Sequence, residues 1–337
     1  MLYKTEVLNA ASRRHAQYYV SKLTKLKAAY QATPESIIPN LRKIMPQVQQ
    51  AHSLLIANHE ASPSDADMLV DITAAAMGCV RMVVSAEVWE RWLRIGIETA
   101  TARDRHVDRL DFTIERGVHA FRQGDLENAW MFAQTGEKAA TRLAETGKRA
   151  QCTYLQALVY QKRGETKQAQ VAIAKARQDY EAANDQAGIG KVWSFMAQAA
   201  IDAMDYERAQ QLLEQNIQLW QAIGDRRQMA VEQYQLGVML SNQVRYAESD
   251  TYLHDAREAF QQLADRRYEA YSLQILSANA MERGLLDEAL AYINGAYELF
   301  VTVNDQRGVA GALNYMGRIY DKQGDYERAI DAHQRAT

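Results

Sequence analysis

The sequence has few of the residues that mark redox, secreted or nucleic-acid-binding proteins. It contains only two cysteines, Cys79 and Cys152, in 337 residues, too few for a disulfide framework or a cysteine metal site. Its 39 Lys and Arg are balanced by 42 Asp and Glu, a net charge of −3, so the positive field expected of a nucleic-acid-binding surface is missing. We therefore expect a reducing compartment and no direct contact with nucleic acid.

Long apolar runs are also absent. The best candidate for a membrane span, residues 74–84, is interrupted by Arg81 and is shorter than the roughly 20 apolar residues that a spanning helix needs. The stretch from Met1 to His15 carries charges, among them Lys4 and Glu6, and lacks the apolar segment of a secretory signal. These features predict a cytoplasmic protein without a membrane segment.

Proline and glycine divide the chain near residue 64. All four prolines lie at or before Pro63, and all 17 glycines lie from Gly78 onward. From residue 64 to the end the sequence is rich in Ala, Gln, Glu, Arg and Leu, which form helices at little cost in free energy. Alternating strand patterns are missing, so the fold class predicted is all-α.

A 40-residue repeat accounts for most of the length. Six segments of similar sequence, such as Gly324-Asp325-Tyr326-Glu327-Arg328-Ala329, begin at the evenly spaced positions 124, 164, 204, 244, 284 and 324. The same step separates Asp185, Asp225, Asp265 and Asp305. It also separates a series of small residues: Gly117, Ala157, Ala197, Gly237, Ser277 and Gly317. Three markers in one register, from about residue 105 onward, indicate a repeat architecture.

The spacing within one repeat predicts an antiparallel pair of helices. Nineteen residues separate Asp185 from Asp205, and nineteen more separate Asp205 from Asp225, which suits two helices of about four turns with short links. In the Gly-Asp pairs, the glycine is expected to end the first helix at positive φ and the aspartate to cap the second. Small residues in both helices allow close packing.

These residues resemble the tetratricopeptide repeat (TPR). Gly317, Tyr320, the segment 324–329 and Ala336 are similar to the family consensus, and Trp193 occupies its aromatic position. The resemblance implies a right-handed α-solenoid of stacked antiparallel helix pairs, the TPR superhelix. We accordingly divide the chain into an N-terminal helical linker or cap (1–63), a divergent helical repeat (64–104) and an array of about six repeats (105–337). The last repeat is expected to be truncated, since its second helix stops short of the aspartate due at position 345.

The N-terminal stretch has a second resemblance. Arg14-His15-Ala16-Gln17-Tyr18-Tyr19, followed by a proline-bounded helix over residues 37–51, looks like the segment that joins ATPase module and helical repeats in STAND regulators, the signal-transduction ATPases with numerous domains. This resemblance implies the C-terminal sensor region of a larger regulator. The ATPase motif itself is missing, because the run Gly188-Ile189-Gly190-Lys191 lacks the remaining residues of a phosphate-binding loop.

Patterns for catalysis and metal binding are missing as well. The seven histidines are scattered, and only His52 and His59 share a helical face, without a carboxylate or cysteine to complete a metal set. Both cysteines fall in predicted first helices, where they are expected to be small buried residues. We expect a fragment that is not an enzyme and holds no cofactor or metal, although its parent protein would be an ATPase.

The surface expected to bind a ligand is the concave groove, which the first helices of stacked repeats line. The side chains expected to face the groove lie one or two helical turns before each small residue, or just after it. They are Tyr154, Gln198, Tyr234, Tyr271, Gln274, Asn314 and Arg318. Tyrosines offer contact area with a polar tip, while the amides and Arg318 can bind a peptide backbone or carboxylate. The alternative is that these side chains are partly buried spacers between repeats.

Two functions remain open. In the first, the groove binds a protein, peptide or small inducer and holds an attached ATPase inactive until the ligand arrives. In the second, the array is a constitutive scaffold for protein assembly. The fragment is expected to be monomeric, and heat-shock chaperone binding is not favoured because the Lys and Asn clamp of chaperone adaptors does not occur. Arginines beside the repeated aspartates are expected to form salt bridges between repeats: Arg226, Arg227, Arg266, Arg267 and Arg307.

Overall fold

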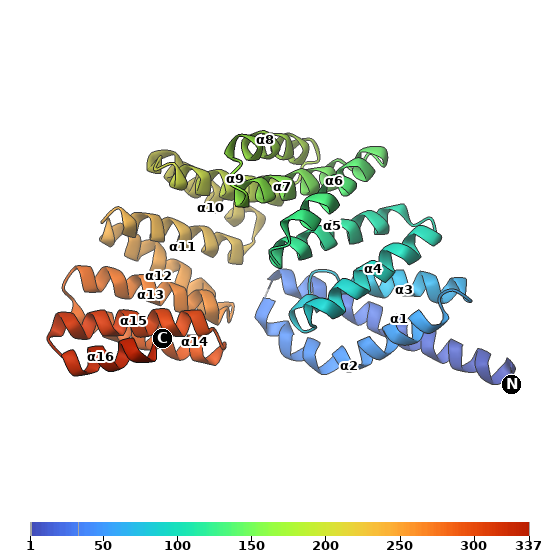
Figure 1. The fold of residues 1–337 in the computed structure, drawn as a ribbon, viewed down its shortest axis with the longest axis horizontal. Coiled ribbons are helices and arrows are strands. Elements are labelled where there is room, and N and C mark those ends of the chain that lie inside the picture. The colour runs from blue at the N-terminus through green and yellow to red at the C-terminus, as the bar shows by residue number, and fades with distance from the viewer. Residues whose placement is uncertain (1, 33, 337) are drawn as a thin grey trace. The chain divides into compact units, whose positions relative to one another are not determined.

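The computed structural model describes residues 2–32 and 34–336, and within them it has sixteen α-helices, one short 3₁₀ helix and no strand. The all-α fold class is thus confirmed. The chain forms two compact units, residues 1–192 (unit 1) and residues 193–337 (unit 2), and the division falls inside α9 (Gln186–Asp202). Figure 1 shows the succession of helices within each unit.

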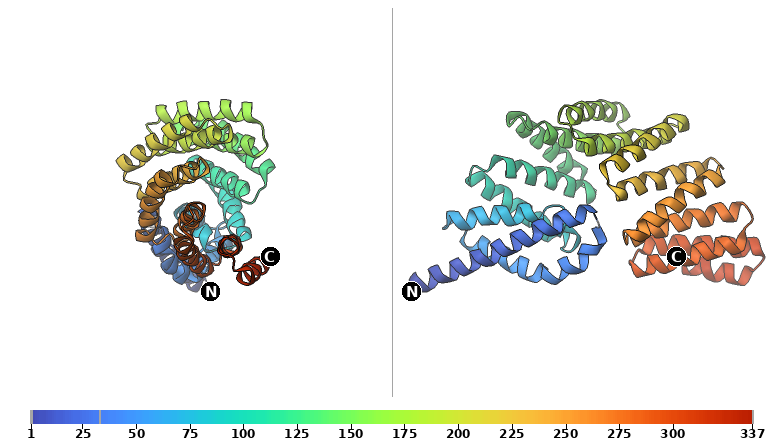
Figure 2. Two further views of the ribbon diagram at one scale, coloured as in Figure 1. Left: turned by 90° about the vertical axis from the view of Figure 1, so that its left-hand side faces the viewer. Right: turned by 180° about the vertical axis from the view of Figure 1, so that it is seen from behind.

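Unit 1 begins with three helices that share one core: α1 (Leu2–Ala32), α2 (Pro34–Asn58) and α3 (Pro63–Ala76). The right-hand panel of Figure 2 shows α1, in dark blue, crossing the other two. Helix α2 continues through Pro39 and Pro46, so it is longer than the proline-bounded helix predicted over 37–51. Both prolines are exposed, and the opposite face buries apolar residues at helical spacing, Ile37, Leu41, Ile44, Val48 and Leu55. Burial of that face offsets the hydrogen bonds that the prolines remove.

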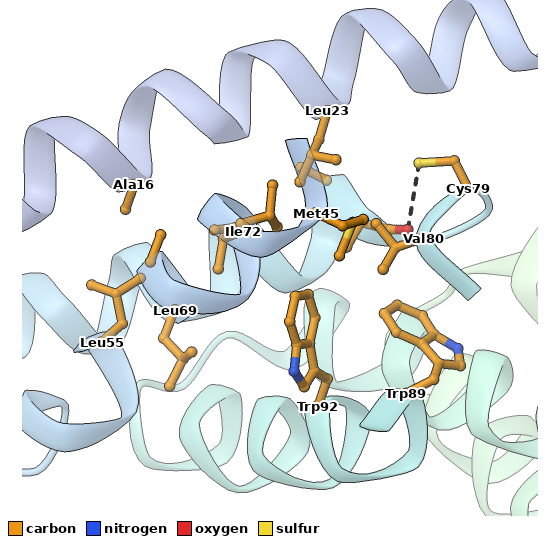
Figure 3. Close-up of a cluster of buried hydrophobic side chains, with 14 of the residues drawn as sticks. Ala16, Leu23, Met45, Leu55, Leu69, Ile72, Cys79, Val80, Trp89 and Trp92 are labelled. Atoms are coloured by element: carbon orange, nitrogen blue, oxygen red, sulfur yellow. Dashed lines mark hydrogen bonds between the residues drawn. The ribbon is translucent and has the colours of Figure 1, made fainter. Parts of the chain in front are cut away.

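The indole rings of α4 (Ala86–Ala102) close the other side of this core. In Figure 3, Trp89 and Trp92 face Leu69, Ile72 and Val80. His52 of α2 is also buried and stacks on Trp92, with ring centroids 3.8 Å apart. Burial and the nearby Arg91 lower the pKa of His52 to about 3, so this imidazole is a neutral packing group.

Cys79 does not lie in a first helix, contrary to the prediction. It occupies the turn between α3 and the 3₁₀ helix η1 (Val80–Met82), next to Gly78, whose φ of +89° ends the helical path. The Cys79 side chain is nevertheless fully buried, and its thiol is 3.7 Å from the carbonyl oxygen of Ala76. Burial raises the pKa of this thiol and also that of Cys152 in α7, so both are inert packing residues.

From α5 onward the helices are regular. They have nearly equal lengths and begin at a constant step, for example at positions 106, 126, 146 and 166, as the two-helix repeat predicts. In unit 1 they are α5 (His106–Arg122), α6 (Leu126–Arg142), α7 (Thr146–Lys162) and α8 (Thr166–Ala182). In unit 2 they are α10 (Tyr206–Ile223), α11 (Arg226–Asn242), α12 (Tyr246–Gln262), α13 (Arg266–Glu282), α14 (Leu286–Thr302), α15 (Gln306–Gln323) and the shorter α16 (Tyr326–Arg335).

The repeated small residues lie where paired helices approach closely. A Cβ added to Gly237 of α11 would come within 2.7 Å of the Leu253 side chain of α12. Where serine replaces alanine or glycine, its hydroxyl is satisfied by the backbone of the partner helix: Ser249 donates to the carbonyl of Gly237 at 2.7 Å and Ser277 to that of Ala289 at 2.8 Å. The small-residue marker therefore reports close helix packing.

The turn inside each hairpin confirms the predicted Gly-Asp signal. Gly124 and Gly324 have φ of 81° and 79°. The carboxylates of Asp125 and Asp325 accept the backbone N–H of Asn128 and of Arg328, each at 3.1 Å. At the same place two repeats carry larger residues, Met204 and Val244, with φ of 59° and 64°.

Val244 is the most strained of these turn residues, because a β-branched side chain disfavours positive φ. We expect Val244→Gly to raise the free energy of unfolding of unit 2 by about 0.5–1 kcal/mol, since about 1–2 kcal/mol of strain is removed and part is returned as glycine's entropy. Little packing is lost, because Val244 is 68% exposed. Urea unfolding measures the change. The converse Gly284→Val should destabilise, and a loss of stability in Val244→Gly would contradict the assignment of strain.

Candidate functional site

The seven residues predicted for the groove lie on first helices of hairpins. Tyr154 is on α7 in unit 1, and the other six are in unit 2: Gln198 on α9, Tyr234 on α11, Tyr271 and Gln274 on α13, and Asn314 and Arg318 on α15. Gln198, Asn314 and Arg318 are exposed, whereas the tyrosines and Gln274 are half-buried. The predicted set therefore contains two kinds of residue.

The tyrosines of unit 2 pack across the boundaries between repeats. Tyr234 meets the ring of Tyr268 edge-on, with centroids 5.8 Å apart. Tyr271 meets Phe300 in the same way at 5.0 Å, and its hydroxyl donates to Asp305 Oδ2 at 3.1 Å. Burial raises the pKa of both phenols. Both tyrosines thus pack between repeats, as in the alternative that the sequence left open, and both residues remain partly exposed.

Two further tyrosines belong to this neighbourhood and were not predicted. The phenols of Tyr268, Tyr271 and Tyr315 all lie near enough to that of Tyr234 to add to the rise of its pKa that burial causes. The guanidinium of Arg227 lies 5.4 Å from the ring centroid of Tyr268, and that of Arg318 lies 5.2 Å from Tyr315. We call these six residues the tyrosine–arginine surface. The sequence analysis missed Tyr268 and Tyr315 because neither lies one or two helical turns before, or directly after, a repeated small residue. The only feature of the sequence that could have selected them is that both are tyrosines on first helices.

The exposed polar residues make weak contacts with neighbours. Gln198 donates to Asp202 at 2.8 Å, and a ring nitrogen of His333 lies 3.3 Å from the amide oxygen of Asn314. Arg318 contacts Glu282 at 3.3 Å, across one repeat boundary. Exposed pairs of this kind are worth less than about 1 kcal/mol, so a ligand can displace them at small cost.

Two of the five arginines beside the repeated aspartates, Arg227 and Arg267, form the predicted salt bridges between repeats. Arg227 contacts Asp265 at 2.8 Å and Arg267 contacts Asp305 at 3.2 Å. The Asp265 carboxylate is buried and that of Asp305 is mostly covered. These two arginines therefore serve the packing of the array.

Two hollows are formed where a first helix packs against second helices. One, of about 330 Å³, is lined by α7 and α8, and the other, of about 260 Å³, by α14, α15 and α16. They occupy equivalent repeat positions, because Tyr160 lines the first and Tyr320 the second.

In residues 2–32 and 34–336, no three His, Cys, Asp or Glu side chains gather as they would around a metal ion. None of the helices described there has the length and apolarity to cross a bilayer.

Comparisons with known proteins agree with the repeat geometry. Residues 269–337 match the family model described as tetratricopeptide repeat. Among curated proteins none matches the sequence. A Rap protein crystallised with competence and sporulation factor is similar in structure, with a TM-score of 0.60 and 13% identity over 96% of this chain and 97% of that one. The apo quorum sensor NprR from B. thuringiensis has a TM-score of 0.53 and 11% identity over 98% of both chains.

A third structure bears on the resemblance to STAND regulators. The STAND protein with a tetratricopeptide repeat sensor from Pyrococcus horikoshii has a TM-score of 0.61 and 14% identity, over 85% of this chain and 45% of that one. At such identities the likeness concerns the fold alone. The hairpins of this chain thus have the fold of a tetratricopeptide-repeat solenoid, and residues 269–337 also match that repeat in sequence.

Proposed function

We propose that this chain is a non-catalytic binding domain, which holds a protein, peptide or small inducer on the first helices of unit 2. The observation that carries the proposal is the tyrosine–arginine surface, where four phenol rings lie near one another and two of them pack against the guanidinium groups of Arg227 and of the exposed Arg318. Aromatic and arginine side chains are the commonest energetic anchors of protein interfaces. The half-buried tyrosines are already ordered by repeat packing, so binding would immobilise few side chains.

The proposed role in a larger protein is that of the sensor arm of a STAND-type regulator, acting in the cytoplasm. Its support is the N-terminal resemblance together with the similar fold of a STAND protein's repeat sensor. A constitutive scaffold for protein assembly is the alternative. Sequencing the gene upstream of Met1 separates them: a phosphate-binding loop followed by a helical lid favours the sensor, and an unrelated enzyme favours the scaffold. Neither role requires more than a monomeric repeat domain.

The binding surface is tested with a displayed library of linear peptides, selected on the purified chain. For the tightest peptide, we expect Arg318→Ala and Tyr315→Ala each to weaken binding about tenfold, the loss of one anchor worth more than about 1 kcal/mol. Isothermal calorimetry measures the affinity, and circular dichroism confirms that helix content is kept. Glu298→Ala is the matched control, an exposed residue on the second helix α14. A peptide that is insensitive to Arg318 and Tyr315 but lost in Val171→Asp, at the hollow on α8, would overturn the proposed site.

A further inference from the structure

Unit 2 contains an almost completely buried acid, Glu232, at a repeat position that carries no charge in the other repeats. Glu232 of α11 aligns with Cys152, Val192, Ser272 and Ala312 in the other repeats. Asn216 of α10 aligns with Gly136, Ala176, Ala256 and Ala296. Both are almost completely buried, with exposed fractions of 1% and 0%. Two polar residues thus enter the core at one joint of the array, between α9, α10 and α11.

The two residues are joined through Ser194 of α9. The Ser194 hydroxyl donates to Glu232 Oε1 at 2.5 Å, and the Asn216 amide donates to the Ser194 oxygen at 2.9 Å. The indole of Trp220, on α10, lies beside the same carboxyl group. One direct hydrogen bond, from Ser194 of α9, therefore reaches the Glu232 carboxyl group, and Asn216 of α10 supports that serine, while among the described residues Glu232 Oε2 and Trp220 Nε1 form no hydrogen bond.

No cation compensates this carboxylate. Within the part of the chain that the structure describes, the groups from α9 and α10 that act on Glu232 are Ser194, Asn216 and Trp220, all uncharged, and no charged group of α12 or α13 contributes. Arg257 of α12 acts on Glu269 of α13 instead. Burial therefore dominates and raises the pKa of Glu232 from 4.5 to about 7, against the opposing effect of these three neighbours.

We propose that Glu232 makes the joint between α9, α10 and α11 responsive to pH near neutrality, so that alkalinisation loosens the packing of this part of unit 2. The neutral acid is accommodated by its hydrogen bond with Ser194, whereas the ionised form leaves an uncompensated charge in the core. This inference concerns regulation of the fold and does not depend on the proposed ligand.

The direction of the effect follows from proton linkage. In the unfolded chain Glu232 ionises near its ordinary pKa, while in the folded chain it stays protonated up to about pH 7. Below pH 4.5 Glu232 is protonated in both states, and the free energy of unfolding is at its highest. It falls as the pH rises from 4.5 to about 7, because only the unfolded chain is ionised there, and it stays constant above about pH 7, where both states are ionised. A shift of this size corresponds to a fall in the folding equilibrium constant on the order of a hundredfold.

The test uses the full chain, by NMR and by urea unfolding between pH 5 and 8.5. With ¹³C-labelled glutamate carboxyls, we expect one resonance, assigned through the backbone to Glu232, to titrate near pH 7. Stability should fall with pH in the wild type and in the control Glu298→Gln, an exposed acid in unit 2. The fall should largely disappear in Glu232→Gln, which keeps the side-chain shape and stays neutral.

Hydrogen exchange locates the loosening. After correction for intrinsic rates, protection of α9–α11 should drop between pH 5 and about 7 in the wild type, while that of α14–α15 stays constant. A Glu232 resonance that titrates below pH 5 would overturn the proposal, and this result needs no variant to fold. An equal pH slope in wild type and Glu232→Gln would overturn it as well.

Discussion

Gly308→Ala is expected to lower the free energy of unfolding of unit 2 by about 3 kcal/mol, the cost of overpacking a rigid core. A Cβ at this position would lie 2.2 Å from Cδ1 of Phe300, and the ring of Phe300 is fully buried between α14 and α15. The ring has no space to move away, so the helices must separate. Calorimetric or urea unfolding of the purified chain measures the loss.

Gly311→Ala provides the control, three residues later in the same helix. A Cβ there would meet only the terminal amide nitrogen of Gln274, at 3.2 Å, and alanine favours the helix by up to about 1 kcal/mol. Its stability should be equal to or above that of the wild type. Gly188→Ala repeats the experiment in unit 1, where the ring of Tyr180 lies 2.1 Å from the added Cβ. Wild-type stability in Gly308→Ala would show that the Phe300 ring does not pack directly against position 308.

The second large effect is expected at Asp265, whose carboxylate has two roles. Its Oδ1 accepts the backbone N–H of Tyr268 at 3.4 Å at the start of α13, and its Oδ2 accepts Arg227 Nε from the preceding repeat at 2.9 Å. Asp265→Ala removes both the helix cap and a charge-assisted hydrogen bond between repeats. We expect a loss of about 2 kcal/mol, of which the cap contributes about 1 kcal/mol.

Two variants separate the roles of Asp265. Asp265→Asn keeps a capping oxygen but removes the charge, so about half of the loss should remain. Asp225→Ala removes a cap of the same kind, from Asp225 to the N–H of Gln228, at a repeat in which Ala187 stands in place of the aligned arginine. Its loss should be nearer to about 1 kcal/mol. Equal losses in Asp225→Ala and Asp265→Ala, by urea unfolding, would mean that the contact with Arg227 adds nothing.

The two roles of Asp265 explain why aspartate recurs every 40 residues in the sequence. The repeated aspartate caps the first helix of each repeat in which it occurs, as for Asp185, Asp225 and Asp305. In two repeats an arginine from the start of the preceding repeat also binds the aspartate, in the pairs Arg227–Asp265 and Arg267–Asp305. A cap depends on residues close in sequence, which is why its position was predictable.

The positions that pack against the buried aromatic rings were not predictable in the same way. Positions 180, 220, 260 and 300 carry Tyr, Trp, Phe and Phe, and the residues eight later are Gly188, Gln228, Tyr268 and Gly308. Gly188 and Gly308 leave room for the rings of Tyr180 and Phe300, whereas Tyr268 stacks on Phe260 with ring centroids 5.0 Å apart. Which solution a repeat uses depends on how two helices approach, and no local rule states it.

The candidate site shows the same limit. Counting turns placed Tyr234 and Tyr271 correctly on first helices, yet their rings partly fill the boundaries between repeats. Tyr268 and Tyr315 joined them only in the folded array. The residues with the largest remaining freedom to bind are the exposed ones, Gln198, Asn314 and Arg318.

By itself the sequence determined the helical class, the 40-residue period, the hairpin turns and the caps, because helix propensity, glycine at positive φ and side-chain capping act within a few residues of chain. Only the tertiary structure decided which side chains are consumed in packing and which stay open. It also decided that Glu232 lies in a core without a counter-ion. Burial and pKa depend on the neighbours that three different helices bring together, and those neighbours are distant in the sequence.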